Sequence, residues 1–331
     1  MKFRYLVRLD MKFSFISTRE LEAVIGDNNG ISMEKISDRE IVINSDADLS
    51  KIFLRLASVK EAYLLISDIS EIEKHMSRGL RSRLGYYIPY TISILNFHKN
   101  PREANSMLRK IVDDFPWIKI SLNSPQLEIR LFGENLGIKL PVGRDIILNR
   151  DPKYRPYAPP AAMESLLSRV LVNLTGIRSG GVFLDPFCGT GSIALEAAEI
   201  GMRVICIDIN PRAVEAAMML LHKYYGHECV EIRVGDARNL PFADRFIDGI
   251  ATDPPYGISS PTFGVSINKL YEDFLSEARR ILKPRAKLVI CHTPSVPLRE
   301  FASKIGLEYE HEFSMRIHSK LRRIISILRA G

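Results

Sequence analysis

The pentapeptide Asp253-Pro254-Pro255-Tyr256-Gly257 follows directly on an apolar run and carries the clearest chemical signal in this chain. An amine attached to a nucleobase ring is a poor nucleophile because its lone pair is delocalised into the ring. A carboxylate and a backbone carbonyl that each accept one N–H bond draw the nitrogen toward tetrahedral geometry, and the carboxylate can take up the released proton. Asp253 and the carbonyl of Pro254 fit these roles, while Tyr256 offers a flat face on which a base can stack. A plain proline-rich turn would explain the prolines but not the residues that flank them.

A second group, Asp185-Pro186-Phe187-Cys188-Gly189-Thr190-Gly191, ends another apolar run and leads into a helical pattern. Gly189 and Gly191 allow a ligand to approach the backbone, and the start of a helix presents unpaired N–H groups that suit a carboxylate. Because dinucleotide and other nucleoside sites use related turns, this turn alone identifies no ligand.

Two further carboxylates narrow the choice of ligand. Asp208 ends the next apolar run, where nucleoside sites place an acid on ribose hydroxyls, and Asp236 follows the run after that. If these runs are adjacent parallel strands, the carboxylates converge on one crevice with Asp185. Strand-end caps explain any one of them, but poorly explain all three beside a glycine turn. Since Asp185 is an acid where a dinucleotide fingerprint has glycine, we expect a ligand with a cationic amine, such as S-adenosylmethionine.

The elements that must position these residues begin at Ala161, where strand-like and helix-like runs alternate. Continuous apolar strands in such alternation indicate a parallel sheet covered on both faces. Residues 306–330 instead indicate two strands joined by a basic turn. We therefore predict a doubly wound α/β sheet, mostly parallel, with a terminal antiparallel hairpin. The expected strands are 181–185, 203–208, 230–234, 246–252 and 287–292, and the expected helices include 163–174, 192–201 and 211–226.

The front of the chain shows two smaller α+β patterns. Residues 1–70 predict a ferredoxin-like domain, and residues 71–141 a second domain. Residues 142–160 collect proline and charge, which is typical of a linker before a domain at 161–331. The expected strands are 3–9, 40–45, 61–67, 91–95, 117–122, 126–132 and 136–140, and the expected helices are 17–26, 46–58 and 101–115.

Length and composition agree with a multidomain globular protein. A chain of 331 residues is longer than one hydrophobic core usually organises. The 46 Lys and Arg against 39 Asp and Glu give a net charge of +7, which favours a polyanionic partner without requiring one. No stretch approaches the roughly 20 apolar residues that cross a bilayer, so we expect a cytoplasmic protein with no membrane partner.

The four cysteines, Cys188, Cys206, Cys229 and Cys291, lack the spacing of a metal site. We therefore expect no zinc or other metal and no disulfide scaffold. Cys206 and Cys291 fall within apolar strand-like runs, a position typical of reduced core thiols.

The segments DPFCGTG, CIDIN and VGDAR resemble the binding segments of class I S-adenosylmethionine-dependent methyltransferases. The resemblance implies a Rossmann-like fold in which each segment meets one part of the cofactor. Pro160-Ala161 resembles an extra cofactor-contacting motif of the family, although the proline that often follows is replaced here. The implied cofactor residues are Asp185, Phe187, Gly189 and Gly191 at the methionine part, Asp208 at the ribose, Asp236 and Ala237 at the adenine, and Ile209 as a further cofactor contact.

The DPPY segment resembles the amine-methylating families, which act on adenine, cytosine or guanine. The front of the chain favours RNA, since residues 114–132 resemble the end of a THUMP domain, an RNA-binding module of tRNA-modifying enzymes. Together with LVNLTG, ATDPPYG and RIHSKLRR, these residues make the chain resemble THUMP-containing tRNA guanine-N2 methyltransferases that act at position 10. This resemblance implies tRNA as the partner, with addition of one or two methyl groups.

A basic turn within the final hairpin is a candidate RNA contact, where phosphates would position the substrate over the site. A solvated basic turn without function explains each of its residues about as well. The candidate residues are Arg316, His318, Lys320, Arg322 and Arg323.

Three other functions remain open at this point. One is guanine-N2 methylation at another tRNA position or in rRNA, and a second is N6-adenine methylation. The third is a non-catalytic RNA-binding protein with a methyltransferase fold, against which the intact carboxylates argue. We expect the protein to be a monomer.

Overall fold

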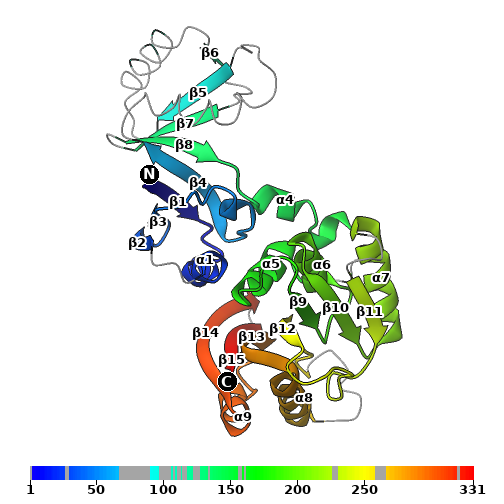
Figure 1. Ribbon diagram of the computed structural model, residues 1–331. Helices are drawn as coiled ribbons and strands as arrows, with labels where there is room; N and C mark the ends of the chain where they lie inside the picture. The colour runs from blue at the N-terminus through cyan, green and yellow to red at the C-terminus, as the bar shows by residue number, and fades with distance from the viewer. Residues whose placement is uncertain are drawn as a thin grey trace. The chain divides into compact units, whose positions relative to one another are not determined.

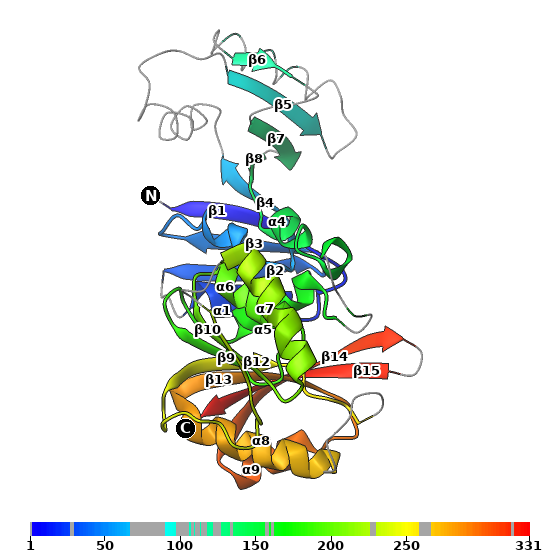
Figure 2. The ribbon, with the colours of Figure 1, turned by 90° about the vertical axis from the view of Figure 1, so that its right-hand side faces the viewer.

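The computed structural model describes two compact units, shown in Figures 1 and 2. One comprises residues 1–14, 28–54 and 59–142, and the other comprises residues 15–27, 55–58 and 143–331. The residues that the structure describes are 2–26, 30–66, 90–96, 118–121, 127–132, 135–155, 162–225, 230–257, 266–318 and 321–331, together with residues 106, 109, 113 and 159.

The first unit is built on one sheet of eight described strands. In sheet order these are β2 (Ile31–Ser37), β3 (Glu40–Ser45), β1 (Phe3–Leu9), β4 (Val59–Ile66), β8 (Asn135–Leu140), β7 (Leu127–Phe132), β5 (Tyr90–Asn96) and β6 (Ile118–Ile120). Strand β5 runs parallel to both of its neighbours, and the other pairs are antiparallel. The predicted domain boundary at residue 70 and most of the predicted helix 101–115 lie outside the described residues.

The helix expected at residues 46–58 is wrong, because only the short 3-10 helix η1 (Ile52–Leu54) forms there. The buried Tyr5 competes for the polar groups of this segment: its hydroxyl donates to Asp48 over 3.1 Å and accepts from the Leu49 amide over 2.9 Å. Side-chain hydrogen bonds of this kind satisfy backbone groups without a helical ladder.

The second unit contains the predicted doubly wound sheet with its terminal hairpin, which confirms the expected fold class. In sheet order its strands are β11 (Val230–Val234), β10 (Arg203–Asp208), β9 (Val182–Asp185), β12 (Ile247–Thr252), β13 (Leu282–His292), β15 (Leu321–Ala330) and β14 (Leu307–His318). Strands β9 to β13 pair in parallel, and β15 is antiparallel to both β13 and β14. The chain leaves β9 toward β10 and later returns to its other side at β12. This reversal opens a crevice at the carboxyl ends of β9 and β12.

Helices cover both faces of this sheet (Figure 1). One layer holds α5 (Ser165–Leu174), α6 (Ser192–Glu199) and α7 (Pro211–Tyr225), and the other holds α8 (Ile267–Ile281) and α9 (Leu298–Lys304). All four residues of β9 are buried, as expected for a strand covered on both sides. Helix α8 begins at a capping serine, Ser266, whose hydroxyl accepts a 3.3 Å hydrogen bond from the Lys269 amide.

Two early segments of the chain complete the second unit. Helix α1 (Ser17–Ile25) packs on α5, and all ten residues of α5 are buried. The buried Glu20 of α1 accepts hydrogen bonds from the amides of Ala57 and Ser58 and from the side chain of Asn173 on α5, over 3.0, 2.9 and 2.7 Å. One carboxylate thus joins three separate parts of the chain.

Part of the predicted linker 142–160 is also folded onto the second unit. It contains α4 (Arg144–Leu148) and η2 (Pro152–Tyr154). Arg150 donates two 2.9 Å hydrogen bonds to the fully buried Glu196 of α6, and Arg155 donates a 2.7 Å hydrogen bond to Ser192 at the start of that helix.

Candidate active site

The glycine turn between β9 and α6 provides open backbone at the crevice. Gly189 and Gly191 have φ values of 52° and 84°, which lie in the left-handed region that favours glycine. A Cβ added at Gly189 would meet no atom within 4 Å, so this part of the turn faces free space. A Cβ added at Gly191 would lie 3.3 Å from the Cβ of Ala217, because the turn packs closely against α7.

Asp208, at the end of β10, holds the glycine turn in place. One of its carboxylate oxygens accepts a 2.8 Å hydrogen bond from the Gly189 amide, and the other accepts a 2.9 Å bond from the Asn210 amide. Each oxygen has a second lone pair that can accept from a ribose hydroxyl. The next residue, Ile209, is 37% exposed and offers an apolar surface beside this carboxylate.

A disulfide between Cys188 and Cys206 joins the glycine turn to β10, with 5.6 Å between the Cα atoms. The expectation that Cys206 is a reduced thiol is therefore wrong. The pairing depends on the turn folding back over β10, where the Cys188 amide donates a 2.9 Å bond to the Ile207 carbonyl. Sequence spacing does not reveal this fold-back. Cys291 is free and buried, as predicted, and Cys229 lies outside the described residues.

Asp185 is 1% exposed and accepts a 2.7 Å hydrogen bond from the hydroxyl of Thr252, the last residue of β12. Burial, together with the smaller effect of the charges of Asp208 and Asp253, raises the pKa of the Asp185 carboxyl to about 8. The carboxylates of Asp208 and Asp253 are therefore both close enough to act on Asp185 at this edge of the sheet. Such a cluster attracts a cationic ligand.

The structure describes three of the remaining five cofactor candidates, Phe187, Asp236 and Ala237. Phe187 packs edge-on against Phe274, with 5.1 Å between the ring centroids. Asp236 follows β11, and a 2.6 Å ion pair with Arg238 lowers the pKa of its carboxyl, while Ala237 beside it is buried. Pro160 and Ala161 lie outside the described residues.

The amine-accepting motif, Asp253-Pro254-Pro255-Tyr256, directly follows β12. Strand β12 is the neighbour of β9, which leads into the glycine turn. Tyr256 donates a short hydrogen bond from its hydroxyl to one oxygen of Asp253. Arg323, from β15, donates a 2.7 Å bond to the Tyr256 hydroxyl and a 3.2 Å bond to the other oxygen of Asp253. Burial raises the pKa of Asp253, while Arg323 and the hydrogen bonds from Tyr256 and Cys291 oppose this rise. Pro254, between Asp253 and Tyr256 in the sequence, is buried.

The predicted RNA contacts that the structure describes do not all face the same surroundings. Arg316 and Arg322 face each other across the β14–β15 hairpin, and both are exposed. His318 ends β14, and Lys320 lies outside the described residues. Arg323 is instead turned toward Asp253, a contact that the basic pattern of this segment does not predict.

Sequence reasoning also missed Thr252 and Cys291 as partners of the site carboxylates. Each is the kind of side chain that a strand interior commonly buries, and neither belongs to a motif. Their contacts with Asp185 and Asp253 follow from strand order, which places β12 between β9 and β13.

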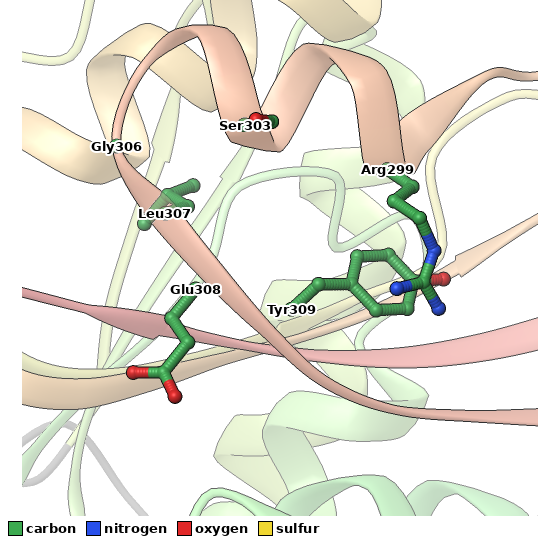
Figure 3. Close-up of a pocket in the computed structure, with 6 residues that line it drawn as sticks. All are labelled: Arg299, Ser303, Gly306, Leu307, Glu308 and Tyr309. Atoms are coloured by element: carbon green, nitrogen blue, oxygen red, sulfur yellow. The ribbon is translucent and has the colours of Figure 1, made fainter.

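A surface hollow of about 430 Å³ lies away from this crevice (Figure 3). It is formed where α9 meets β14, and the guanidinium of Arg299 lies 4.0 Å from the ring centroid of Tyr309. Leu307 pairs with Ala330, whereas Arg323 lies toward the other end of β15, so the hollow is at the opposite end of the hairpin from the amine-accepting motif. Its lining residues are Arg299, Ser303, Gly306, Leu307, Glu308 and Tyr309.

Within the described residues, His, Cys, Asp and Glu do not gather in a group of three or more suited to a metal ion. In that same part of the chain, every helix is too short or too polar to cross a membrane.

The sheet order, the glycine turn and the carboxylates at the switch point define a class I methyltransferase fold. The solved structure of TrmN from Thermus thermophilus has a similar fold, with a TM-score of 0.51 over 99% of this chain and 100% of that one at 18% identity. Residues 152–323 match the family model described as RMKL-like, methyltransferase domain. The chain belongs to this methyltransferase family, whose methyl donor is S-adenosylmethionine.

Two curated relatives share part of this sequence. The tRNA (guanine(10)-N2)-dimethyltransferase of Methanothermobacter thermautotrophicus is 38% identical over 177 residues, which cover 54% of this chain and 52% of that protein. The enzyme of the same name from Pyrococcus abyssi is 33% identical over 222 residues, which cover 64% of this chain and 65% of that protein. The chain therefore spans about half of the first relative and just under two thirds of the second.

Proposed function

We propose that this protein transfers a methyl group from S-adenosylmethionine to the N2 amine of guanine 10 in tRNA, once or twice. The observation that carries the proposal is the position of Asp253 and Tyr256 at the end of β12, beside the glycine turn that follows β9. The names of the two curated relatives support the choice of guanine N2 and of tRNA.

The residues of the crevice fit the proposed cofactor, which supplies an electrophilic methyl group on a sulfonium. The open face at Gly189 leaves room for its methionine part, and Asp185 is the candidate partner of its cationic amine. Asp208 retains lone pairs for the ribose hydroxyls, with the exposed Ile209 beside them. Asp236 and Ala237 are the candidate adenine contacts, although Asp236 shares its carboxylate with Arg238.

The chemistry at the amine is assigned to Asp253, Pro254 and Tyr256. A carboxylate oxygen of Asp253 and the Pro254 carbonyl each accept one N–H of the amine, which localises the nitrogen lone pair, and Asp253 takes up the proton. Since the Tyr256 hydroxyl already donates to Asp253, an entering amine replaces this hydroxyl at one oxygen. The ring of Tyr256 then serves as the stacking face for the base.

Binding of the tRNA substrate is assigned to two regions of the chain. The exposed Arg316 and Arg322, with His318 and Lys320 of the same hairpin, are candidates for phosphate contacts near the site. Residues 1–141, proposed to contain a ferredoxin-like domain and a THUMP domain, would hold the body of the tRNA. We expect the enzyme to act as a monomer in the cytoplasm.

The proposal is tested by nucleoside mass spectrometry of tRNA after incubation with the protein and isotopically labelled S-adenosylmethionine. We expect labelled N2-methylguanosine or N2,N2-dimethylguanosine from wild-type tRNA, and none from a transcript in which guanine 10 is replaced by adenine. Label that persists in this transcript places the target at another guanine. Labelled N6-methyladenosine contradicts the proposed substrate, and so does label in rRNA but not in tRNA when the two are incubated in parallel. Binding of tRNA without label in any nucleoside supports a non-catalytic protein.

A further inference from the structure

Arg323 reaches the amine-accepting motif from a strand that is not adjacent to it. Strand β13 lies between β12 and β15, and Arg323 is one residue before Ile324, which pairs with His292 at the end of β13. The guanidinium therefore passes over the end of β13 to reach Asp253 and Tyr256, with donor-to-acceptor distances of 3.2 and 2.7 Å.

The side chains of Arg323 and Asp253 are 13% and 24% exposed, so their ion pair is largely removed from water. Arg322, the preceding residue, is exposed. A phosphate contact by Arg323 would leave the enclosed Asp253 carboxylate without this guanidinium, and breaking an enclosed ion pair is costly. The two adjacent arginines are thus placed for different tasks.

The fork shape of the guanidinium allows it to fix two groups at once. One nitrogen holds the Tyr256 hydroxyl, while another holds the Asp253 oxygen that Tyr256 does not contact. When a substrate amine takes the place of the tyrosine hydroxyl, Arg323 can keep its bond to Asp253. The carboxylate then has a fixed orientation both before and after the base enters.

We propose that Arg323 is a positioning residue for Asp253, whose carboxyl it holds turned to accept a hydrogen bond from the target amine. This inference rests on the proposed function. Arg323 does not touch the substrate in this role, and it acts through the carboxylate.

The groups that face Asp253 come from five elements. They are Tyr256 in its own loop, Cys291 on β13, Arg323 on β15, Asp185 at the end of β9 and Tyr271 on α8. Burial raises the pKa of Asp253, and the charge of Asp253 in turn helps to raise the pKa of Asp185. Of these five groups only Arg323 is a cation, so its removal should raise the pKa of Asp253 further. A protonated carboxyl cannot take up the proton of the amine, and activity should then need a higher pH.

The test compares Arg323→Gln and Arg323→Lys with the matched control Arg329→Gln, which removes an arginine from the same strand. Arg329 pairs with the exposed Glu308 away from the site. Rates of methyl transfer are measured at saturating tRNA and S-adenosylmethionine over a pH series, together with tRNA affinity over a salt series.

We expect Arg323→Gln to lower the rate at neutral pH on the order of a hundredfold, and to move the acidic limb of the pH–rate profile upward by about one unit. Its tRNA affinity and salt dependence should remain those of the wild type. The rate and pH profile of Arg323→Lys should lie between those of Arg323→Gln and the wild type, because lysine keeps the positive charge but not the fork shape. Arg329→Gln should match the wild type.

The proposal is overturned if Arg323→Gln weakens tRNA binding and flattens its salt dependence while the saturating rate and the pH profile stay unchanged. That result identifies a phosphate contact. It is also overturned if both Arg323 variants lose activity together with their melting temperature and the acidic limb does not move, which identifies a purely structural residue.

A second measurement separates this inference from the proposed function. Carboxyl NMR of the Asp253 side chain, assigned with Asp253→Asn, follows its titration without any substrate. An upward shift in Arg323→Gln supports the positioning role even if the labelled product is not guanine. An unchanged titration overturns that role even if guanine is methylated.

Discussion

The hydroxyl of Thr252 donates a 2.7 Å hydrogen bond to the buried carboxyl of Asp185, and this bond joins the last residues of β12 and β9. The glycine turn starts directly after Asp185, and the amine-accepting motif starts directly after Thr252. One buried contact therefore fixes the distance between the proposed methyl donor and the proposed acceptor. Positioning of this kind supplies much of the rate in a transfer between two bound groups.

The Asp185 carboxyl should make stability depend on pH. Burial raises its pKa to about 8, whereas the unfolded chain has a value of about 3.9. Between these values the folded protein holds a proton that the unfolded chain releases, so the stability that this group contributes is present at low pH and is lost as the pH rises toward about 8. Asp185→Asn, which mimics the protonated acid, should flatten this part of the dependence. Urea unfolding of both proteins over the same pH range gives the free energy of unfolding at each pH. Equal slopes of this free energy against pH in the two proteins would contradict the prediction.

The same carboxyl should link cofactor binding to proton release. A cationic amine favours ionised Asp185, so the affinity of the wild type for S-adenosylmethionine should rise as the pH increases toward about 8. Asp185→Asn should bind more weakly, and its affinity should vary less with pH. Calorimetry in two buffers with different ionisation enthalpies counts the released protons. An affinity that does not vary with pH in the wild type would show that Asp185 does not meet the cation.

Asp208→Ala should weaken S-adenosylmethionine binding by about 1–3 kcal/mol, as expected when buried hydroxyls lose a charged acceptor. The structure adds a second cause, because Asp208 also accepts from the Gly189 amide and so holds the glycine turn. Asp208→Asn keeps one oxygen and should fall between the wild type and the alanine variant. The dissociation constants are measured directly, with tRNA affinity as the control. Equal cofactor affinity in all three proteins would reduce Asp208 to a strand-end carboxylate.

Asp253→Ala should lower methyl transfer by roughly a thousandfold or more, because it removes the acceptor of the amine proton. Cofactor affinity should stay within several-fold of the wild type, since Asp253 is bonded to Tyr256 and Arg323 rather than to the glycine turn. Turnover and calorimetric binding on the same preparation separate these effects. An Asp253→Ala variant with full activity would rule out the catalytic assignment.

The pattern of the sequence predicts the second unit well, because central strands such as β9 and β10 are apolar runs that are buried on both faces, and helices such as α7 and α8 are amphipathic. It predicts less where backbone pairing or tertiary contacts decide the structure. Strand β2 (Ile31–Ser37) was not predicted, since most of its residues are exposed and charged or polar, and its pairing with β3 sets its conformation. Helix α9 (Leu298–Lys304) was also not predicted, and it is only seven residues long.

The site shows the same division between local pattern and tertiary contact. Asp185, Gly189, Asp208 and Asp253 were predicted because each ends or follows an apolar run, and parallel strands bring such residues to one edge. The contact of Arg323 with Asp253 depends on β15 inserting between β13 and β14. The linear sequence places Arg323 in a basic run with Arg322, and this run alone indicates a solvent-facing role.

Truncation should reveal where the catalytic unit begins. The proline-rich and charged segment at residues 142–160 is typical of a linker, and it predicts that a fragment from Asp151 folds and binds S-adenosylmethionine by itself. The structure argues for an earlier boundary, because such a fragment lacks Arg150, which donates two 2.9 Å hydrogen bonds to the buried Glu196. It also lacks α1, which packs on α5. We expect the fragment 151–331 to melt at a lower temperature than the fragment 143–331, and both to melt below the full chain.

A point variant tests the same boundary without truncation. In the full chain, Glu20→Ala leaves the amides of Ala57 and Ser58 and the side chain of Asn173 without the acceptor that they share. Burying unsatisfied donors costs about 1–3 kcal/mol each, so the free energy of unfolding of the second unit should fall by about 3 kcal/mol or more. Glu22→Ala on the exposed side of the same helix is the matched control, and it should change stability little. Urea unfolding, followed by the loss of S-adenosylmethionine binding, reports on this unit alone. If the fragment 151–331 is as stable as the full chain and Glu20→Ala has no effect, then α1 and Arg150 are dispensable and the catalytic unit begins at Asp151.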